Sequence, residues 1–155
     1  MPSAPVAISV AVPVGKATAD ALMEKLIPRV EALKIGPSTD PTADYGPLVT
    51  KEALERVKNY VDIGVKEGAT LAVDGRGFKM QGYENGFYMG GCLFDNVTRD
   101  MRIYKEEIFG PVLSVVRAHD YDEALALPSE HDYGNGVAIF TRDGDAARDF
   151  AAKVN

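Results

Sequence analysis

The segment 105–112 carries the side chains of this sequence best suited to contact a ligand: Glu106, Glu107 and Phe109. A carboxylate can accept hydrogen bonds from both hydroxyls of a ribose, and an aromatic ring can pack against a flat heterocycle. The Gly-Pro pair that follows predicts a turn in front of the apolar run 112–116. From the residues alone, the segment fits either a ligand-contacting loop or a solvated helix end, and composition by itself favours the second.

The single cysteine and the two histidines are the other candidate reactive side chains. Cys92 lies in an apolar run without a cation or histidine at a recognisable spacing, which predicts a buried structural thiol rather than a nucleophile. His119 is expected at the start of a helix, and His131, between two acidic residues, in a solvated loop. These residues cannot build a closed zinc site, and no calcium-loop spacing occurs, so no metal site is predicted.

Composition excludes several classes of protein. With 155 residues, 46% of them apolar and 26% charged, the chain fits one globular domain. A net charge of −6 argues against a nucleic-acid partner, which would need a basic face. The longest apolar run, 6–14, is too short to span a bilayer and lacks the features of a secretory signal. One cysteine fits a reducing compartment, so we expect a cytoplasmic protein without a membrane partner.

The hydrophobic pattern predicts strands that alternate with helices. Apolar runs that contain β-branched or aromatic residues predict strands over 6–14, 70–73, 87–97, 112–118 and 137–141. Apolar residues at helical spacing predict one helix around 22–33, where Pro28 implies a kink or a break, and a second helix capped by Thr50. Asp120 should cap a third helix that ends before Pro128, and Asp143 should start a fourth. This order indicates an α/β fold, with a largely parallel sheet flanked by helices.

Three motifs resemble signatures of the aldehyde dehydrogenases. They are Glu-Glu-Ile-Phe-Gly-Pro at 106–111, Tyr-Gly-Pro at 45–47 and the Tyr-Gly to Phe-Thr stretch at 133–141, in the family's order. In that family the second Glu binds the nicotinamide ribose and the Phe lies beside the nicotinamide ring. The resemblance therefore implies that Glu107 and Phe109 contact NAD. The segments 7–10 and 89–94 look most like the methylmalonate-semialdehyde dehydrogenases, which use NAD and coenzyme A.

The resemblance also shows what this sequence lacks. In that subgroup the nucleophilic cysteine would stand immediately before Met-Ala-Ile-Ser, and here that place holds Pro5. No G-x-G-x-x-G follows a predicted strand, and the family's nucleotide domain would precede this segment. We therefore expect residues 1–5 to be a leader and 6–155 to be a truncated aldehyde dehydrogenase catalytic domain.

Such an excised fragment should be inactive alone, since the nucleophile and the NAD domain are missing. It should bind neither NAD nor coenzyme A tightly, and it should self-associate through non-native contacts, because the family's oligomerisation segment would follow Asn155. The alternative is an autonomous small α/β binding or scaffold protein that shares only the fold.

Overall fold

Four strands form one mixed sheet in the computed structural model, which describes residues 10–134 and 136–155. They are β1 (Val10–Ala11), β2 (Thr70–Val73), β3 (Cys92–Asp95) and β4 (Val112–Val115), in the spatial order β1-β4-β3-β2. The strands β1, β4 and β3 run parallel, and β2 is antiparallel to β3. The predicted α/β fold with a largely parallel sheet is confirmed.

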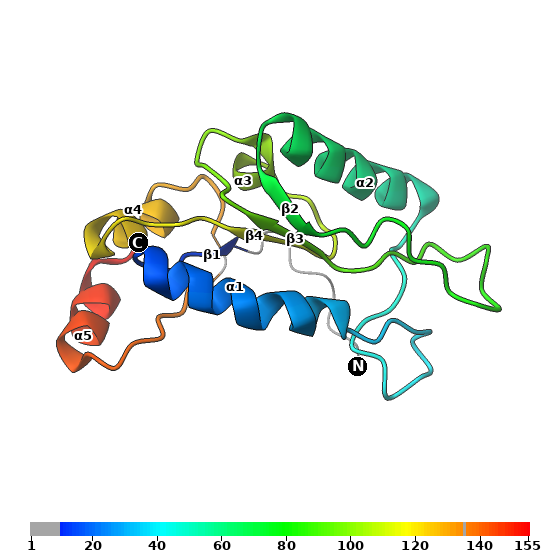
Figure 1. Ribbon diagram of the computed structural model, residues 1–155, viewed down its shortest axis with the longest axis horizontal. Helices are drawn as coiled ribbons and strands as arrows, with labels where there is room; N and C mark the ends of the chain where they lie inside the picture. Colours follow the sequence, from blue (N-terminus) through cyan, green and yellow to red (C-terminus); the bar gives the residue numbers. More distant parts are fainter. Residues whose placement is uncertain (1–9, 135) are drawn as a thin grey trace.

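Two long helices cover opposite faces of this sheet (Figure 1). The helices are α1 (Lys16–Glu31), α2 (Lys51–Lys66), α3 (Arg102–Lys105), α4 (Tyr121–Ser129) and α5 (Gly144–Lys153). Successive residues of a strand point to opposite faces, so Phe94 of β3 packs with Val57 and Val61 of α2, whereas Leu93 packs with Met23 of α1. The side chains of β3 are therefore buried on both faces of the sheet.

Capping side chains begin three of the helices where the sequence predicts them. Thr50, Asp120 and Asp143 each accept a hydrogen bond from a backbone N–H of the first helical turn, at 2.8–3.1 Å. In return, the carboxylate of Glu123 accepts a hydrogen bond from the backbone N–H of His119, at 2.7 Å. Local polar signals therefore fix these helix starts.

Both prolines that were expected to limit a helix lie inside one. Pro28 is in the last turn of α1 and Pro128 in the last turn of α4, so a break at Pro28 and an end before Pro128 are both wrong. A proline removes only the hydrogen bond that its own N–H would donate to the carbonyl four residues earlier, and the residues after it keep theirs, so a helix can run past it. The final turns close through Ala32 N–H to the Pro28 carbonyl, at 3.1 Å, and Glu130 N–H to the Ala126 carbonyl, at 2.9 Å.

The predicted strands differ most from the structure at the two ends of the chain. The strand over 137–141 is wrong, since these residues pair with no strand in the described part of the chain and Phe140 is 96% exposed. An alternating pattern gives a strand its propensity, but pairing requires a free sheet edge at the right place. Of the predicted strand 6–14, β1 covers 10–11, and residues 6–9 lie outside the described residues. The strands β3 and β4 are shorter than predicted.

Candidate functional site

Residues 106–111, called here the motif loop, connect α3 to the amino end of β4 and are fixed at several points. The side chain of Ile108 is buried in the core. A Cβ added at Gly110 would lie 2.5 Å from a γ-carbon of Val57, so only glycine lets the loop approach α2 this closely. The carbonyl of Pro111 accepts a hydrogen bond from the backbone N–H of Cys92, at 2.8 Å, which ties the loop to β3.

Phe109 stands out from this anchored backbone. Its φ of 53° lies in the left-handed region, which is uncommon for a bulky side chain and costs conformational energy. Because Ile108 and Gly110 on either side face inward, the ring of Phe109 points outward and is 42% exposed. The guanidinium carbon of Arg56 lies 5.8 Å from the ring centroid, and an Nη atom of Arg56 donates to the carbonyl of Ile108, at 3.2 Å.

Glu106 anchors the loop rather than offering a ligand group. Its carboxylate accepts two hydrogen bonds from Arg102, at 2.7 and 3.0 Å, and one from the hydroxyl of Tyr60, at 2.6 Å. These donors stabilise the ionised form, Arg102 most strongly, and lower the pKa of Glu106 to about 2. The same contact raises the pKa of Tyr60. The oxygen atoms of Glu106 are therefore already used.

Glu107 is half-buried, and within the described residues no hydrogen bond engages its carboxylate. The structure thus brings both sequence-predicted site residues, Glu107 and Phe109, into one fixed loop. An ionised carboxylate can accept hydrogen bonds from hydroxyl groups, and a presented ring can pack against a planar group. This pair therefore offers groups that can contact a ligand.

The structure separates the other candidates into correct and wrong predictions. Cys92 is buried, its sulfur accepts a hydrogen bond from Gly75 N–H at 3.3 Å, and burial raises the pKa of its thiol to about 11, which confirms the structural thiol. His119 is exposed at the start of α4, as predicted. Pro5 lies outside the described residues.

His131 lies in the loop after α4, as predicted, but the prediction that it is solvated is wrong. Its ring is half-buried and packs edge-on against Tyr104, with centroids 4.8 Å apart. The Nε2 atom lies 2.7 Å from the carbonyl oxygen of Tyr104. Because this partner is 27 residues away in the sequence, the acidic neighbours of His131 gave no indication of it.

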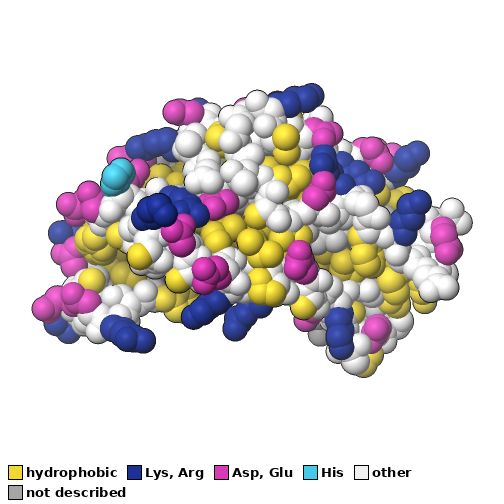
Figure 2. All heavy atoms as spheres, in the orientation of Figure 1, with side chains coloured by type: hydrophobic (Ala, Val, Ile, Leu, Met, Phe, Trp, Pro, Cys, Tyr) yellow, Lys and Arg dark blue, Asp and Glu magenta, His cyan; other side chains and the backbone are white. Residues whose placement is uncertain are grey.

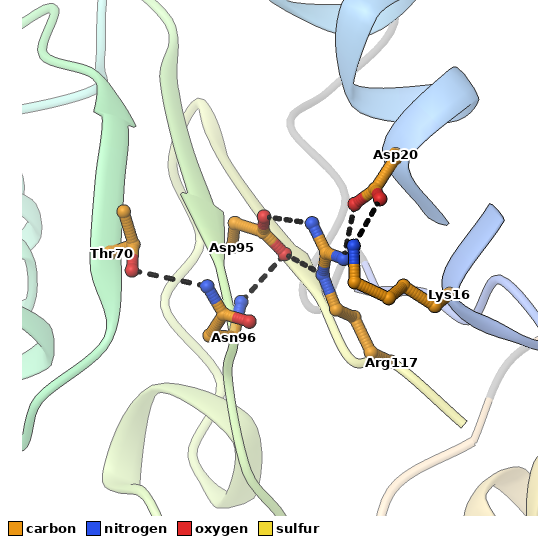
Figure 3. A network of polar contacts seen from close by, with 6 residues as sticks. All are labelled: Lys16, Asp20, Thr70, Asp95, Asn96 and Arg117. Atoms are coloured by element: carbon orange, nitrogen blue, oxygen red, sulfur yellow. Dashed lines mark hydrogen bonds and ion pairs between the residues drawn. The ribbon is translucent and has the colours of Figure 1, made fainter. Parts of the chain in front are cut away.

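Sequence reasoning missed a network of ion pairs at the carboxyl end of the parallel strands (Figure 3). Arg117, just after β4, donates two hydrogen bonds to the carboxylate of Asp95, at 2.7 and 2.9 Å, and one to Asp20 of α1, at 2.6 Å. Lys16 and Asn96 donate further bonds to these carboxylates, at 2.8 and 2.7 Å. Arg117 lowers the pKa of Asp95.

This network ties α1 to the sheet, and its members satisfy one another, so it is structural. A signal for it did exist. An acidic residue lies near the end of one predicted strand and a basic residue near the end of another, and the carboxyl ends of neighbouring parallel strands meet at one edge of a sheet.

Two further findings limit the chemistry. Among residues 10–134 and 136–155, no group of three or more His, Cys, Asp or Glu side chains could hold a metal ion. Over the same residues, no helix combines the length and the apolar character needed to cross a membrane.

Comparison with known proteins identifies the relatives of this chain. The aldehyde dehydrogenase family model matches residues 7–155. A malonate-semialdehyde dehydrogenase from Pseudomonas aeruginosa is 58% identical over 148 residues, which are 96% of this chain and 30% of that protein. The acylating methylmalonate-semialdehyde/malonate-semialdehyde dehydrogenase of Rattus norvegicus mitochondria is 46% identical, over 96% of this chain and 28% of that protein.

A solved structure shows the same fold. It is described as a methylmalonate-semialdehyde dehydrogenase from Sinorhizobium meliloti complexed with NAD, and it matches with a TM-score of 0.92 and 68% identity, over 96% of this chain and 30% of that one. The chain thus spans about 30% of the length of these relatives. Its sequence matches the family over nearly its whole length and its fold matches a solved member, so the chain belongs to the aldehyde dehydrogenase family.

Proposed function

We propose that this chain is a catalytic-domain segment of an NAD-dependent, coenzyme A-acylating (methyl)malonate-semialdehyde dehydrogenase, and that its motif loop contacts the nicotinamide end of NAD. Glu107 would accept hydrogen bonds from the ribose hydroxyls, and Phe109 would pack beside the nicotinamide ring. The observation that carries this proposal is the conformation of Phe109. Its backbone is held at a φ of 53° and its ring is exposed, next to a carboxylate not engaged within the described residues. Backbone strain of this kind is typical of ligand sites.

The names of the relatives support the substrate class and the cofactor. Both curated relatives are named for malonate semialdehyde or its methyl derivative, and one is named as acylating. The Sinorhizobium meliloti structure, which is 68% identical, is described as a complex with NAD. Identity at this level over 96% of the chain goes beyond a shared fold, which disfavours an autonomous scaffold protein.

The reaction of this family needs a thiolate that attacks the aldehyde carbonyl, followed by hydride transfer to NAD and release of the acyl group. In this chain Cys92 cannot supply the thiolate, because it is buried and its pKa is raised to about 11. The resemblance places the nucleophile where Pro5 stands. We therefore expect no turnover by the chain alone, and we retain a cytoplasmic location as an expectation from its single cysteine.

Binding of NAD by this chain should be weak, because two side chains must overcome an association cost of roughly 4–15 kcal/mol. We expect a dissociation constant in the millimolar range or above. Amide NMR during a titration with NAD should show the largest shifts at residues 106–111. Glu107→Gln, which removes the charged acceptor, should weaken binding about tenfold, corresponding to about 1.4 kcal/mol.

Glu24→Gln is a matched control, because Glu24 is an exposed glutamate on α1, which covers the opposite face of the sheet from α2. It should leave the titration unchanged. Shifts that cluster away from the motif loop, or equal affinity in the Glu107→Gln and Glu24→Gln variants, would contradict the proposed site. Production of NADH with malonate semialdehyde and coenzyme A would contradict the expected inactivity.

A further inference from the structure

We propose that Arg56 of α2 is a positioning residue for this site, and that it holds Phe109 in the left-handed conformation that turns its ring toward the cofactor. This inference rests on the proposed function of the motif loop and adds a residue from a different element to it. Arg56 lies 52 residues before its backbone partner, so no local motif marks it.

The contacts of Arg56 act on both parts of Phe109. Its guanidinium donates to the carbonyl of Ile108, at 3.2 Å, and this carbonyl belongs to the peptide group that precedes Phe109. Fixing the orientation of that peptide group restricts the φ of Phe109 directly. The same guanidinium lies 5.8 Å from the ring centroid, within the range of a cation–π contact. One side chain thus restrains the backbone and the ring together.

Arg56 is itself held in place by the helix that carries it. The next residue, Val57, is fully buried, and Gly110 of the motif loop packs directly against it. Helix and loop therefore keep a fixed separation at this point. Arg56 is exposed, so replacing it leaves the core intact.

A restraint of this kind matters because a left-handed φ is disfavoured for phenylalanine. Without Arg56, the loop should populate other conformations in which the ring points elsewhere. If the fraction of molecules that present the ring falls, the apparent affinity for the ligand falls by the same factor. The loss of Arg56 should therefore weaken binding through the conformation of the motif loop.

The test uses the 155-residue chain, nicotinamide mononucleotide as the probe, and three variants. Arg56→Gln removes the charge and the planar group, Arg56→Lys keeps the charge and a donor, and Lys58→Gln removes a charge two residues away, about 200° around α2. The first readout, without ligand, is the strong intraresidue NOE between the amide and α protons of Phe109 that a left-handed φ produces. The second is the affinity for nicotinamide mononucleotide, from amide shifts. Far-ultraviolet circular dichroism checks that each variant is folded.

We expect Arg56→Gln to lose the strong NOE and to bind nicotinamide mononucleotide about tenfold more weakly, as a tenfold fall in the presenting conformation requires. Arg56→Lys should recover part of both effects, and Lys58→Gln should match the parent chain. An unchanged NOE in the folded Arg56→Gln variant would overturn the positioning role. If the probe shifts neither Glu107 nor Phe109 in the parent chain, the proposed function fails instead, and with it the cofactor-directed role of Arg56, even where the NOE still depends on Arg56.

Discussion

The motif loop and the segment 136–155 both carry clear sequence patterns, yet they are held in very different ways. The loop is fixed by buried Ile108, by Gly110 against α2 and by three hydrogen bonds to Glu106. In the second segment, α5 has a side-chain cap at Asp143 but no buried residue, and Phe140 is 96% exposed. A local pattern can therefore start a helix without burying any of its residues, because burial depends on the rest of the fold.

The distribution of side chains on one face shows the same contrast. In Figure 2 hydrophobic side chains gather across the middle of the molecule and toward the end that carries α4 and α5, with charged side chains around them. Within the described residues, the hydroxyl of Tyr121 in α4 donates a partly buried hydrogen bond to the carboxylate of Asp149 in α5, at 3.1 Å. A single hydrogen bond of this kind contributes only about 0.5–1.5 kcal/mol to stability.

Among the changes considered, removing the charge of Asp95, on the buried strand β3, should cause the largest loss of stability. Asp95→Asn leaves Arg117 without its bidentate partner, and we expect a cost of about 2–3 kcal/mol, below that of a fully buried pair because Arg117 is partly exposed. The matched change Asp145→Asn breaks an exposed ion pair with Arg148 and should have no measurable effect. Urea unfolding at pH 7 measures both, and equal effects would remove the proposed difference between the regions.

The stabilisation by the pair of Asp95 and Arg117 should depend on pH in one direction. Arg117 lowers the pKa of Asp95, so the stabilisation is complete above the unfolded-state pKa, about 3.9, and is lost as the pH falls through the folded-state value. The difference between the parent chain and Asp95→Asn should therefore be full at pH 7, begin to shrink below about pH 4, and vanish only below the folded-state pKa of Asp95. Glu106 contributes in the same direction, from its ordinary pKa of 4.5 down to about 2.

Adding one methyl group at a glycine in each region should also lower stability by different amounts, with a smaller difference than for the two ion pairs. Gly110→Ala places a Cβ 2.5 Å from Val57, and we expect a loss of about 1–3 kcal/mol from overpacking. A Cβ at Gly136 meets nothing within 4 Å, so Gly136→Ala should change stability by less than about 0.5 kcal/mol. Thermal unfolding of the two variants side by side tests this. A loss at Gly136 as large as that at Gly110 would show that the segment 136–155 is packed after all.

Two replacements of Phe109 should isolate the strain in the motif loop. Both Phe109→Ala and Phe109→Gly remove the ring, but only glycine adopts a φ of 53° without a steric cost. The glycine variant should therefore be more stable than the alanine variant by about 1 kcal/mol. Chemical denaturation measures this difference. If alanine proves equally stable, the backbone at this position is not strained.

Phe140→Ser should change association more than folding. Since the side chain is 96% exposed, we expect a change in unfolding free energy within about 0.5 kcal/mol. The parent chain should self-associate at high concentration, because exposed apolar surface tends to find a partner, and this variant should do so less. Light scattering over a concentration series provides the measurement. A parent chain that stays monomeric throughout would contradict the expected association.

Sequence alone predicted the parts of this molecule that local physical chemistry decides. The helix caps at Thr50 and Asp120, the strand 70–73 and the burial of Cys92 follow from side-chain hydrogen bonding and hydrophobic pattern. Residues 137–141 show the limit, since a strand needs a partner that its own sequence does not name.

The candidate site likewise contains residues that local sequence predicts and residues that only the fold reveals. Glu107 and Phe109 follow from the motif that contains them, and the structure places them in one loop. The residues of α2 that hold this loop, Arg56 and Tyr60, could not be predicted, because they lie 52 and 46 residues from their partners. Arg102, by contrast, is only four residues from Glu106, so their ion pair is a local one. The positive φ of Phe109 is likewise invisible in a residue type that rarely adopts it.

The position of Cys92 makes it a natural probe for the opening of the sheet. It is the only cysteine of 155 residues, it lies at the start of the central strand β3, and it is 1% exposed. A thiol reagent can therefore reach it only in molecules whose sheet has opened, so the rate of labelling under native conditions reports the frequency of that opening. The same labelling, followed over time, would show how long the fold of this segment persists before its centre meets solvent.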